Sequence, residues 1–134
     1  MTEQERMAHA LARLAGAVVA QVPRLHYRVE YWQNDAFPWC LQLRCIAPAP
    51  VVGETNRIVD AEVECLVTPQ GWRVTADVCR VSTTRVGDED ALILTSHSSD
   101  VPEKSVLEAT LAGVEAFLTG QADLIVNVLS SPAK

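Results

Sequence analysis

Residues 95–100, with the sequence TSHSSD, contain serine, histidine and aspartate, the three residue types of a hydrolytic triad. A triad is defined by a hydroxyl, an imidazole and a carboxylate that meet in space, and closeness along the chain does not supply that geometry. The chain has no Gly-x-Ser-x-Gly motif, which would place a serine on a sharp strand-to-helix turn. A strand end followed by the N-cap of a helix accounts for the same residues, so we expect no catalytic residue here.

The four cysteines lack the spacing of a zinc site. Four residues separate Cys40 from Cys45 and thirteen separate Cys65 from Cys79, unlike the Cys-x-x-Cys pairs that bind structural zinc. In the strands predicted below, Cys45 and Cys65 lie on the inner face about 20 Å apart, whereas Cys40 and Cys79 point outward. We therefore predict buried, reduced thiols that pack as small apolar side chains, and no bound metal. Because the chain has no phosphate-binding loop or dinucleotide fingerprint, we also predict no cofactor.

The element that positions most of the candidate residues is a β-hairpin over residues 57–82. Apolar and polar residues alternate along both halves, which is typical of strands with one buried face. Between the halves, residues 68–71 (TPQG) have Pro and Gly at positions that suit a type I turn. Placing Val67 opposite Trp72 pairs only apolar residues on the inner face, whereas a slip of one residue would place glutamates beside them.

Four carboxylates share the outer face of this hairpin: Asp60, Glu62, Glu64 and Asp77. Glu62 falls opposite Asp77, and like charges in that position are destabilising unless Arg44 or Arg73 lies alongside. Carboxylate oxygens can bind a divalent cation, but side chains on one flat face rarely converge on an ion, so we expect no metal there.

Apolar residues share the outer face with these carboxylates: Trp32, Ile46, Ile58, Leu66 and Val81. Apolar side chains between charges are more typical of a protein interface than of an ordinary solvated surface. We therefore predict a binding site for a protein partner with a basic surface. Its residues would be Asp60, Glu62, Glu64, Asp77, Trp32 and Leu66.

Three of the seven aromatic residues, Tyr31, Trp39 and Trp72, are expected at one end of the inner face, near Val67. Because aromatic side chains dominate burial, the favoured interpretation is that they anchor the core. The alternative is a small-molecule pocket between the sheet and the helices, since such sites are concave and often aromatic.

The remaining strands are weaker patterns. Alternating segments at residues 26–32 and 39–47 predict a second hairpin across a turn-rich link. A fifth strand is predicted over residues 91–97, at an edge of the sheet. Towards the end of the central hairpin the inner pattern fades, and a bulge near Arg80 would carry Val81 to the inside.

Two helices are predicted to flank the strands. Thr2 and Glu5 have the spacing of a capping box, and the apolar residues that follow recur at three- and four-residue steps, so an amphipathic helix should end by Pro23. Asp100 and Glu103 repeat the capping spacing ahead of a second amphipathic helix.

These elements predict an α+β fold in a single domain over residues 1–134. Its five strands form one antiparallel meander, with the N- and C-terminal helices packed on one face in two layers (α-β-β-β-β-β-α). Residues 123–129 fit either a strand or a short extra helix, and the spacing of their apolar residues favours the helix.

Charge and composition restrict the partners. The chain of 134 residues carries a formal charge of −6, and its pI is about 4.9. A negative domain repels phosphate backbones and anionic lipids, so we predict no binding to nucleic acid or to a membrane. No export signal is visible, and no apolar run approaches the length that spans a bilayer, so we expect a cytoplasmic protein.

The leading hypothesis is a non-enzymatic protein-interaction domain, of the kind that serves as an immunity protein, a chaperone or an assembly factor. It would bind its partner through the outer sheet face or an edge strand, and we expect a homodimer. The alternative hypothesis is a small-ligand-binding protein or enzyme with an aromatic pocket at Tyr31, Trp39 and Trp72.

Overall fold

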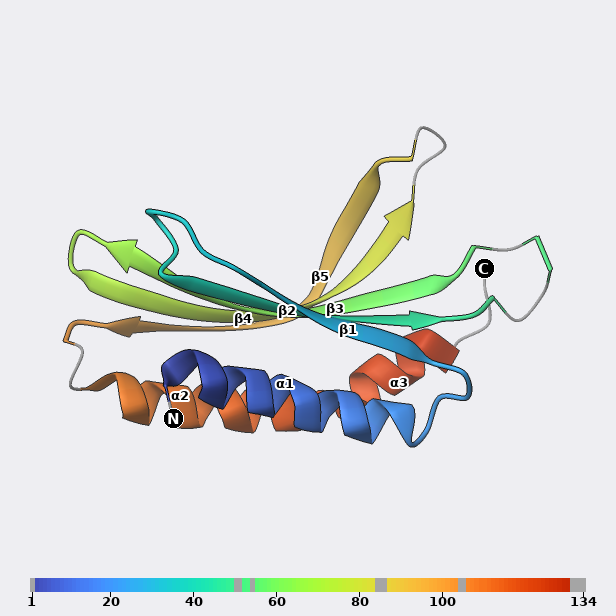
Figure 1. Cartoon of the computed structure of the whole chain (residues 1–134), viewed down its shortest axis with the longest axis horizontal. Coiled ribbons are helices and arrows are strands. Elements are labelled where there is room, and N and C mark those ends of the chain that lie inside the picture. The colour runs from blue at the N-terminus through green and yellow to red at the C-terminus, as the bar shows by residue number, and fades with distance from the viewer. Residues whose placement is uncertain (1, 50–51, 54, 84–86, 104–105, 131–134) are drawn as a thin grey trace.

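The computed structural model of the chain describes residues 2–49, 52–53, 55–83, 87–103 and 106–130. Figure 1 shows a twisted sheet lying on one layer of helices, which confirms the predicted α+β fold and its order of elements. The helices and strands, in chain order, are α1 (Glu3–Val19), β1 (His26–Trp32), β2 (Trp39–Ala47), β3 (Arg57–Thr68), β4 (Gly71–Thr83), β5 (Glu89–Val101), α2 (Leu107–Thr119) and α3 (Ala122–Ser130).

The five strands form one antiparallel sheet in the order β1-β2-β3-β4-β5, so each strand pairs with its neighbours in sequence. The register of the central hairpin is the predicted one, with Val67 opposite Trp72 and Glu62 opposite Asp77. The hydrophobic alternation decides this register, because a shift of one residue would turn the apolar side chains of one of the two strands towards solvent.

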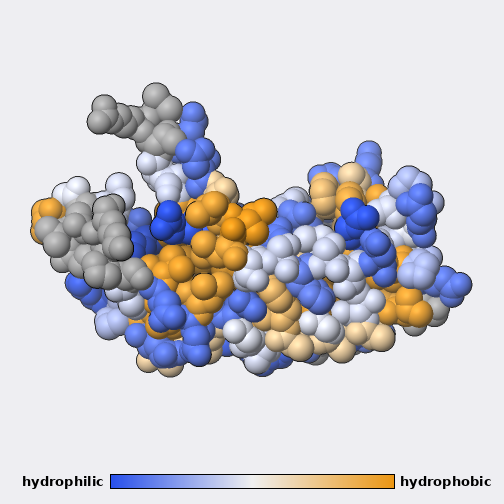
Figure 2. All heavy atoms as spheres, turned by 180° about the vertical axis from the view of Figure 1, so that it is seen from behind, coloured by the Kyte–Doolittle hydropathy of each residue, from blue (hydrophilic) through white to orange (hydrophobic). Residues whose placement is uncertain are grey.

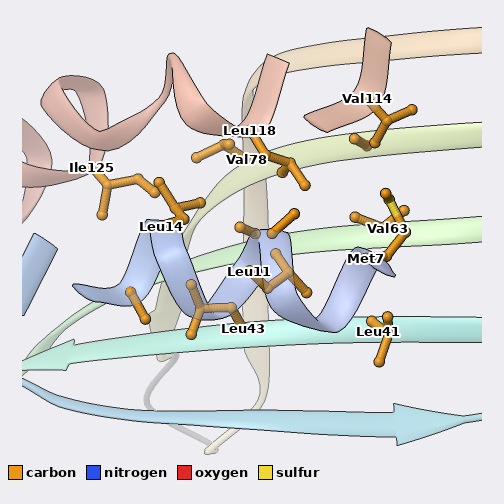
Figure 3. Close-up of a cluster of buried hydrophobic side chains, with 14 of the residues drawn as sticks. Met7, Leu11, Leu14, Leu41, Leu43, Val63, Val78, Val114, Leu118 and Ile125 are labelled. Atoms are coloured by element: carbon orange, nitrogen blue, oxygen red, sulfur yellow. The ribbon is translucent and has the colours of Figure 1, made fainter. Parts of the chain in front are cut away.

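The core lies between the sheet and the helices. Figure 3 shows Leu11 and Leu14 of α1, Leu118 of α2 and Leu43 and Val78 of the sheet gathered in this layer, and all five are buried. Complete burial of such a side chain contributes about 1.5–3 kcal/mol relative to an exposed position. The inner face of the sheet therefore holds the helices in place, and the outer face is left for other contacts.

The predicted N-cap of α1 is confirmed, although the Glu5 carboxylate accepts its hydrogen bond from the Thr2 hydroxyl and not from a backbone N–H. Thr2 is the N-cap residue, and its hydroxyl oxygen accepts a hydrogen bond from the backbone N–H of Glu5. The helix ends at Val19, ahead of Pro23.

The predicted start of the second helix is wrong. Asp100 is the penultimate residue of β5, where its carboxylate accepts a hydrogen bond from Nε of Arg73 at 2.8 Å. Pairing between β4 and β5 continues to Val101, opposite Trp72, so the backbone at Asp100 is extended and cannot begin a helix. The helix α2 begins at Leu107, and the side chain of its N-cap residue, Val106, makes no capping hydrogen bond.

The predicted bulge exists, but it lies on the other strand. The pairing of β4 with β5 shifts between Val78 and Cys79, which leaves Leu94 of β5 as the extra residue. The ladder between β3 and β4 continues without a shift, so Val81 stays opposite Ile58 on the outer face. The expectation that Val81 turns inward is therefore wrong, because β4 is held by two neighbours whereas the edge strand β5 can absorb the extra residue.

The segment after α2 is a helix, as favoured from its spacing: α3 buries Ile125 and Leu129. The stretch Leu107–Ser130 is long and apolar enough to cross a membrane by length and composition alone. Core helices of soluble proteins pass the same test, and here Leu111, Val114 and Leu118 are fully buried. The stretch is therefore only weak evidence for a membrane segment.

Candidate functional site

The outer face of the sheet is the face opposite the helices (Figure 1). The register places all six residues of the predicted partner site on this face. The register aligns neighbouring strands in rows across this face. Glu62 of β3 lies between Gln42 of β2 and Asp77 of β4, and Ser96 of β5 continues the row. The strands thus bring carboxylates that are far apart in sequence to the centre of one surface.

Asp60 is the deepest of these carboxylates, with 4% of its surface exposed. Nε and Nη2 of Arg44 donate to its two oxygens, each at 2.9 Å. The same guanidinium donates from Nη1 and Nη2 to the carboxylate of Glu89, at 2.8 and 2.9 Å. These hydrogen bonds raise the pKa of Arg44 and lower the pKa of Glu89. The single positive charge of Arg44 is thus shared between the carboxylates of Asp60 and Glu89, so Arg44 adds no net positive charge to the face.

Two of the other three carboxylates, Glu62 and Asp77, accept hydrogen bonds from donors that carry no charge. Nε2 of Gln42 donates to Oε1 of Glu62 at 2.6 Å, and Oγ of Ser96 donates to Oδ1 of Asp77 at 2.6 Å. Burial raises the pKa of Glu64, and the charges of Glu62 and Asp77 raise it further. Among the described residues, no basic side chain forms an ion pair with Glu62, Glu64 or Asp77.

The two apolar members of the predicted site border this group of acids. Trp32 lies opposite Cys40, which in turn lies opposite Glu64. Leu66 is half-buried and lies opposite Arg73. The indole of Trp32 therefore lies two strands from Glu64, with β2 between them, and is 37% exposed. A partner that covers Glu62, Glu64 and Asp77 would also reach this indole.

The three aromatic residues proposed for a ligand pocket lie on the inner face but in different surroundings. Trp39 is buried in the core, and Trp72 is half-buried against it. Tyr31 is exposed: its hydroxyl accepts a hydrogen bond from Nε2 of Gln4 in α1 and donates one to Oε1 of Gln33 at 2.6 Å.

A cavity of about 280 Å³ lies at the end of the sheet beside Trp72. Neither Tyr31 nor Trp39 lines it. The Arg73–Asp100 ion pair occupies one wall, so its two charged groups already satisfy each other. The residues around it are Thr68, Gln70, Trp72, Arg73, Asp100 and Val101, followed by Pro102.

The serine, histidine and aspartate of residues 95–100 do not converge. Ser99 Oγ lies 3.4 Å from Nε2 of His97, and the imidazole stacks on Phe117 with 5.5 Å between ring centroids. Asp100 points to the opposite face of the sheet, where it pairs with Arg73. Successive residues of a strand alternate between faces, so this carboxylate cannot orient that imidazole as a triad requires.

The cysteines lie where the register prediction placed them: Cys45 faces Val59 and Cys65 faces Trp39 on the inner side. All four are free and buried. Burial raises the pKa of Cys45 to about 12 and those of Cys40, Cys65 and Cys79 to about 11. In the described part of the chain, no cluster of three or more His, Cys, Asp or Glu side chains could hold a metal ion.

Two features of the surface were not predicted. The ion pair of Arg44 with Glu89 forms because the β4–β5 hairpin bends over the outer face, and no pattern in the sequence announces that bend (Figure 1). The second feature is the exposure of every residue of β1. The alternation of its residues is that of a half-buried strand. The position of β1 at the edge of the sheet, which the sequence does not give, explains why it is exposed.

Comparison of the chain with protein-family models, with curated proteins and with solved structures gives no match in any of the three. The function is therefore inferred from the geometry and charge of the chain itself.

Proposed function

We propose that the chain is a cytosolic, non-enzymatic protein-interaction domain that binds a basic surface of a partner protein through the outer face of its sheet. The observation that carries this proposal is the group formed by Glu62, Glu64 and Asp77. These three carboxylates lie side by side on β3 and β4, and no described basic side chain neutralises them.

The electrostatics of the group favour an added positive charge. Burial together with the neighbouring carboxylates raises the pKa of Glu64, which means that its ionised form is disfavoured where it stands. A lysine or arginine of a partner would relieve this repulsion and would bring a charge-assisted hydrogen bond. Arg44 cannot take that role, because Asp60 and Glu89 already occupy its guanidinium.

The experiment compares capture of partners by the wild-type chain and by the double variant Glu62→Lys, Glu64→Lys. Immobilised protein is incubated with lysate of the native host, and the bound proteins are quantified by mass spectrometry at low and at high salt. We expect the variant to lose the basic proteins that the wild type captures, and high salt to weaken capture by the wild type, since exposed charges are screened.

The matched control is Ala12→Lys, Ala17→Lys, Asp123→Lys, which changes the net charge equally but on the helix layer. Ala12 and Ala17 lie in α1 and Asp123 in the first turn of α3, and all three are exposed. Loss of capture in the first variant but not in this control supports the proposal. Equal capture by all three proteins, or equal loss in both variants, contradicts it.

A further inference from the structure

The edge strand β1 differs from the rest of the sheet in its exposure. All seven of its residues are exposed, whereas most residues of β2 are buried. Within the described sheet β1 pairs only with β2, so its other side presents unpaired backbone N–H and C=O groups. An edge of this kind is a template for another strand.

The inner side of β1 is apolar and only partly covered. Tyr27, Val29 and Tyr31 lie opposite the buried residues Cys45, Leu43 and Leu41 of β2, so they continue the core face of the sheet. Yet they are 52%, 41% and 48% exposed. The helix layer therefore covers β1 only in part and leaves three large side chains of the core face in contact with solvent.

The charges on the outer side of β1 are complementary to a second copy of the same strand. Arg28 and Glu30 both point outward, and they pair with each other at 3.0 Å within the strand. If two β1 strands pair antiparallel about a two-fold axis through Val29, Arg28 of each copy lies opposite Glu30 of the other. The four charges then alternate in sign around the axis, and cross-strand pairs of this kind are stabilising.

Only one register gives this result. A shift of two residues in either direction places Arg28 opposite Arg28 or Glu30 opposite Glu30, and like charges directly opposite are destabilising. A shift of one residue turns the apolar face of one strand towards the charged face of the other. The register centred on Val29 also pairs all seven residues of the strand, and it places Tyr27 opposite Tyr31 on the apolar side.

The other edge of the sheet also exposes apolar residues, with Leu92 at 56% and Ile93 at 58%, but it lacks complementary charges. The strand β5 has acidic residues near both ends, Asp90 and Asp100, and antiparallel pairing with a copy of itself would bring them together. It also contains the bulge at Leu94. Figure 2 shows apolar side chains gathered below the β4–β5 hairpin on this side of the molecule, but acidic ends and a bulge are features that protect edges from pairing.

We propose that two copies of this chain associate through antiparallel pairing of their β1 strands, centred on Val29, to form a continuous ten-stranded sheet. The two-fold contact buries the apolar side chains that α1 leaves uncovered, and the Arg28–Glu30 pairs fix its register. The hydroxyl of Tyr31 is already held by Gln4 and Gln33, so this side chain needs little further ordering. The contact does not use Glu62, Glu64 or Asp77, and its test is independent of the outer-face proposal.

The first test uses charge reversal and measures molar mass by light scattering over a wide concentration range. The wild type is expected at twice 14.6 kDa. Arg28→Glu places four negative charges at the axis and Glu30→Arg places four positive charges there, so each variant alone should dimerise about tenfold more weakly or worse. An equimolar mixture of the two variants should recover the dimer, because the heterodimer again opposes unlike charges.

Recovery in the mixture separates a lost contact from a misfolded chain, since two unfolded variants could not complement each other. A monomeric wild type at all concentrations overturns the proposal. So does a dimer that neither single variant weakens.

The second test locates the two-fold axis by cross-linking. Antiparallel neighbours have Cα atoms about 4.5–5.5 Å apart, a separation that a disulfide can span. Val29→Cys should therefore give a covalent dimer under mild oxidation. In the control Tyr27→Cys, the two new thiols lie four residues apart along the seam, about 13 Å, and should not link. Linkage of both variants alike, or of Tyr27→Cys alone, overturns the proposed register.

Discussion

Arg44 of β2 donates two hydrogen bonds to Glu89 of β5, although β3 and β4 lie between those strands. In a flat sheet three strand spacings amount to about 14 Å. The pair can form because the β4–β5 hairpin bends over the outer face (Figure 1). Arg44 also binds the buried Asp60, so one side chain connects the deepest acid of the face to the hairpin.

Replacement of Arg44 by Met is expected to lower the free energy of unfolding by about 3 kcal/mol, because it leaves the Asp60 carboxylate buried without its partner. Glu89→Gln should cost well under 1 kcal/mol, since Glu89 is half exposed and solvent screens its charge. Urea unfolding followed by circular dichroism measures both. Equal losses for the two variants would contradict the assignment of Asp60 as the dependent group.

Glu64→Gln is expected to stabilise the protein at neutral pH. The pKa of Glu64 in the folded state is raised above its ordinary value of 4.5, so the folded protein binds this proton more tightly than the unfolded chain does. The stabilisation from the protonated form is complete below pH 4.5 and is lost as the pH rises through the raised folded pKa. The variant should therefore gain over the wild type above that range and show no gain below it.

Thermal unfolding of both proteins from pH 3.5 to 8 measures this difference. Glu89→Gln provides a control of opposite sign, because Arg44 lowers the pKa of Glu89. Its carboxylate stabilises the fold above the ordinary pKa, and that stabilisation disappears as the pH falls through the lowered folded pKa. A Glu64 variant less stable than the wild type at pH 8 would refute the repulsion inferred among Glu62, Glu64 and Asp77.

The four thiols are expected to react with a disulfide reagent such as DTNB far more slowly in the folded protein than in denaturant. All four are buried, and their pKa values are raised to about 11 or 12, so almost no thiolate is present at neutral pH. The absorbance of the released thiolate follows the reaction. Rapid labelling of Cys40 or Cys79 in the native state would mean that the outer face opens more readily than its burial implies.

Gly71→Ala is expected to destabilise the central hairpin by more than about 1 kcal/mol. Gly71 has a φ of 138°, and an added Cβ would lie 2.4 Å from the backbone oxygen of Val101. The matched substitution Gly16→Ala lies in α1, where an added Cβ meets nothing within 4 Å, and it should stabilise by about 0.5–1 kcal/mol. Differential scanning calorimetry of the two variants should give shifts of opposite sign.

The sequence alone is sufficient for much of the sheet, because alternation over long strands leaves one register that places the apolar residues of the inner face opposite one another. The pairs Val67–Trp72 and Glu62–Asp77 follow from it. The start of α2 does not, because Asp100 and Glu103 have a capping spacing but pairing with β4 keeps Asp100 extended. Local patterns therefore fail where a neighbouring strand competes for the same residues.

The candidate site is likewise predicted from the sequence in part. That Asp60, Glu62, Glu64 and Asp77 share a face follows from the period of two, and the register places them there. To predict the role of Arg44, the bend of the sheet must be known, and this bend depends on how the strands coil together. To predict the exposure of β1, the width of the helix layer must be known, and no single segment of the sequence encodes it.

The helix layer joins the two ends of the described chain, since Arg6 of α1 binds Glu108 and Glu115 of α2 (Figure 1). During synthesis, all five strands emerge from the ribosome before α2 and α3 do. Val74, Ala76 and Val78 of β4 then have no helix to cover them, although their pairing strands are complete. A nascent chain at this stage presents an apolar sheet with α1 alone on it. Cellular chaperones can bind this sheet until α2 and α3 have emerged and Leu129 has packed into the core.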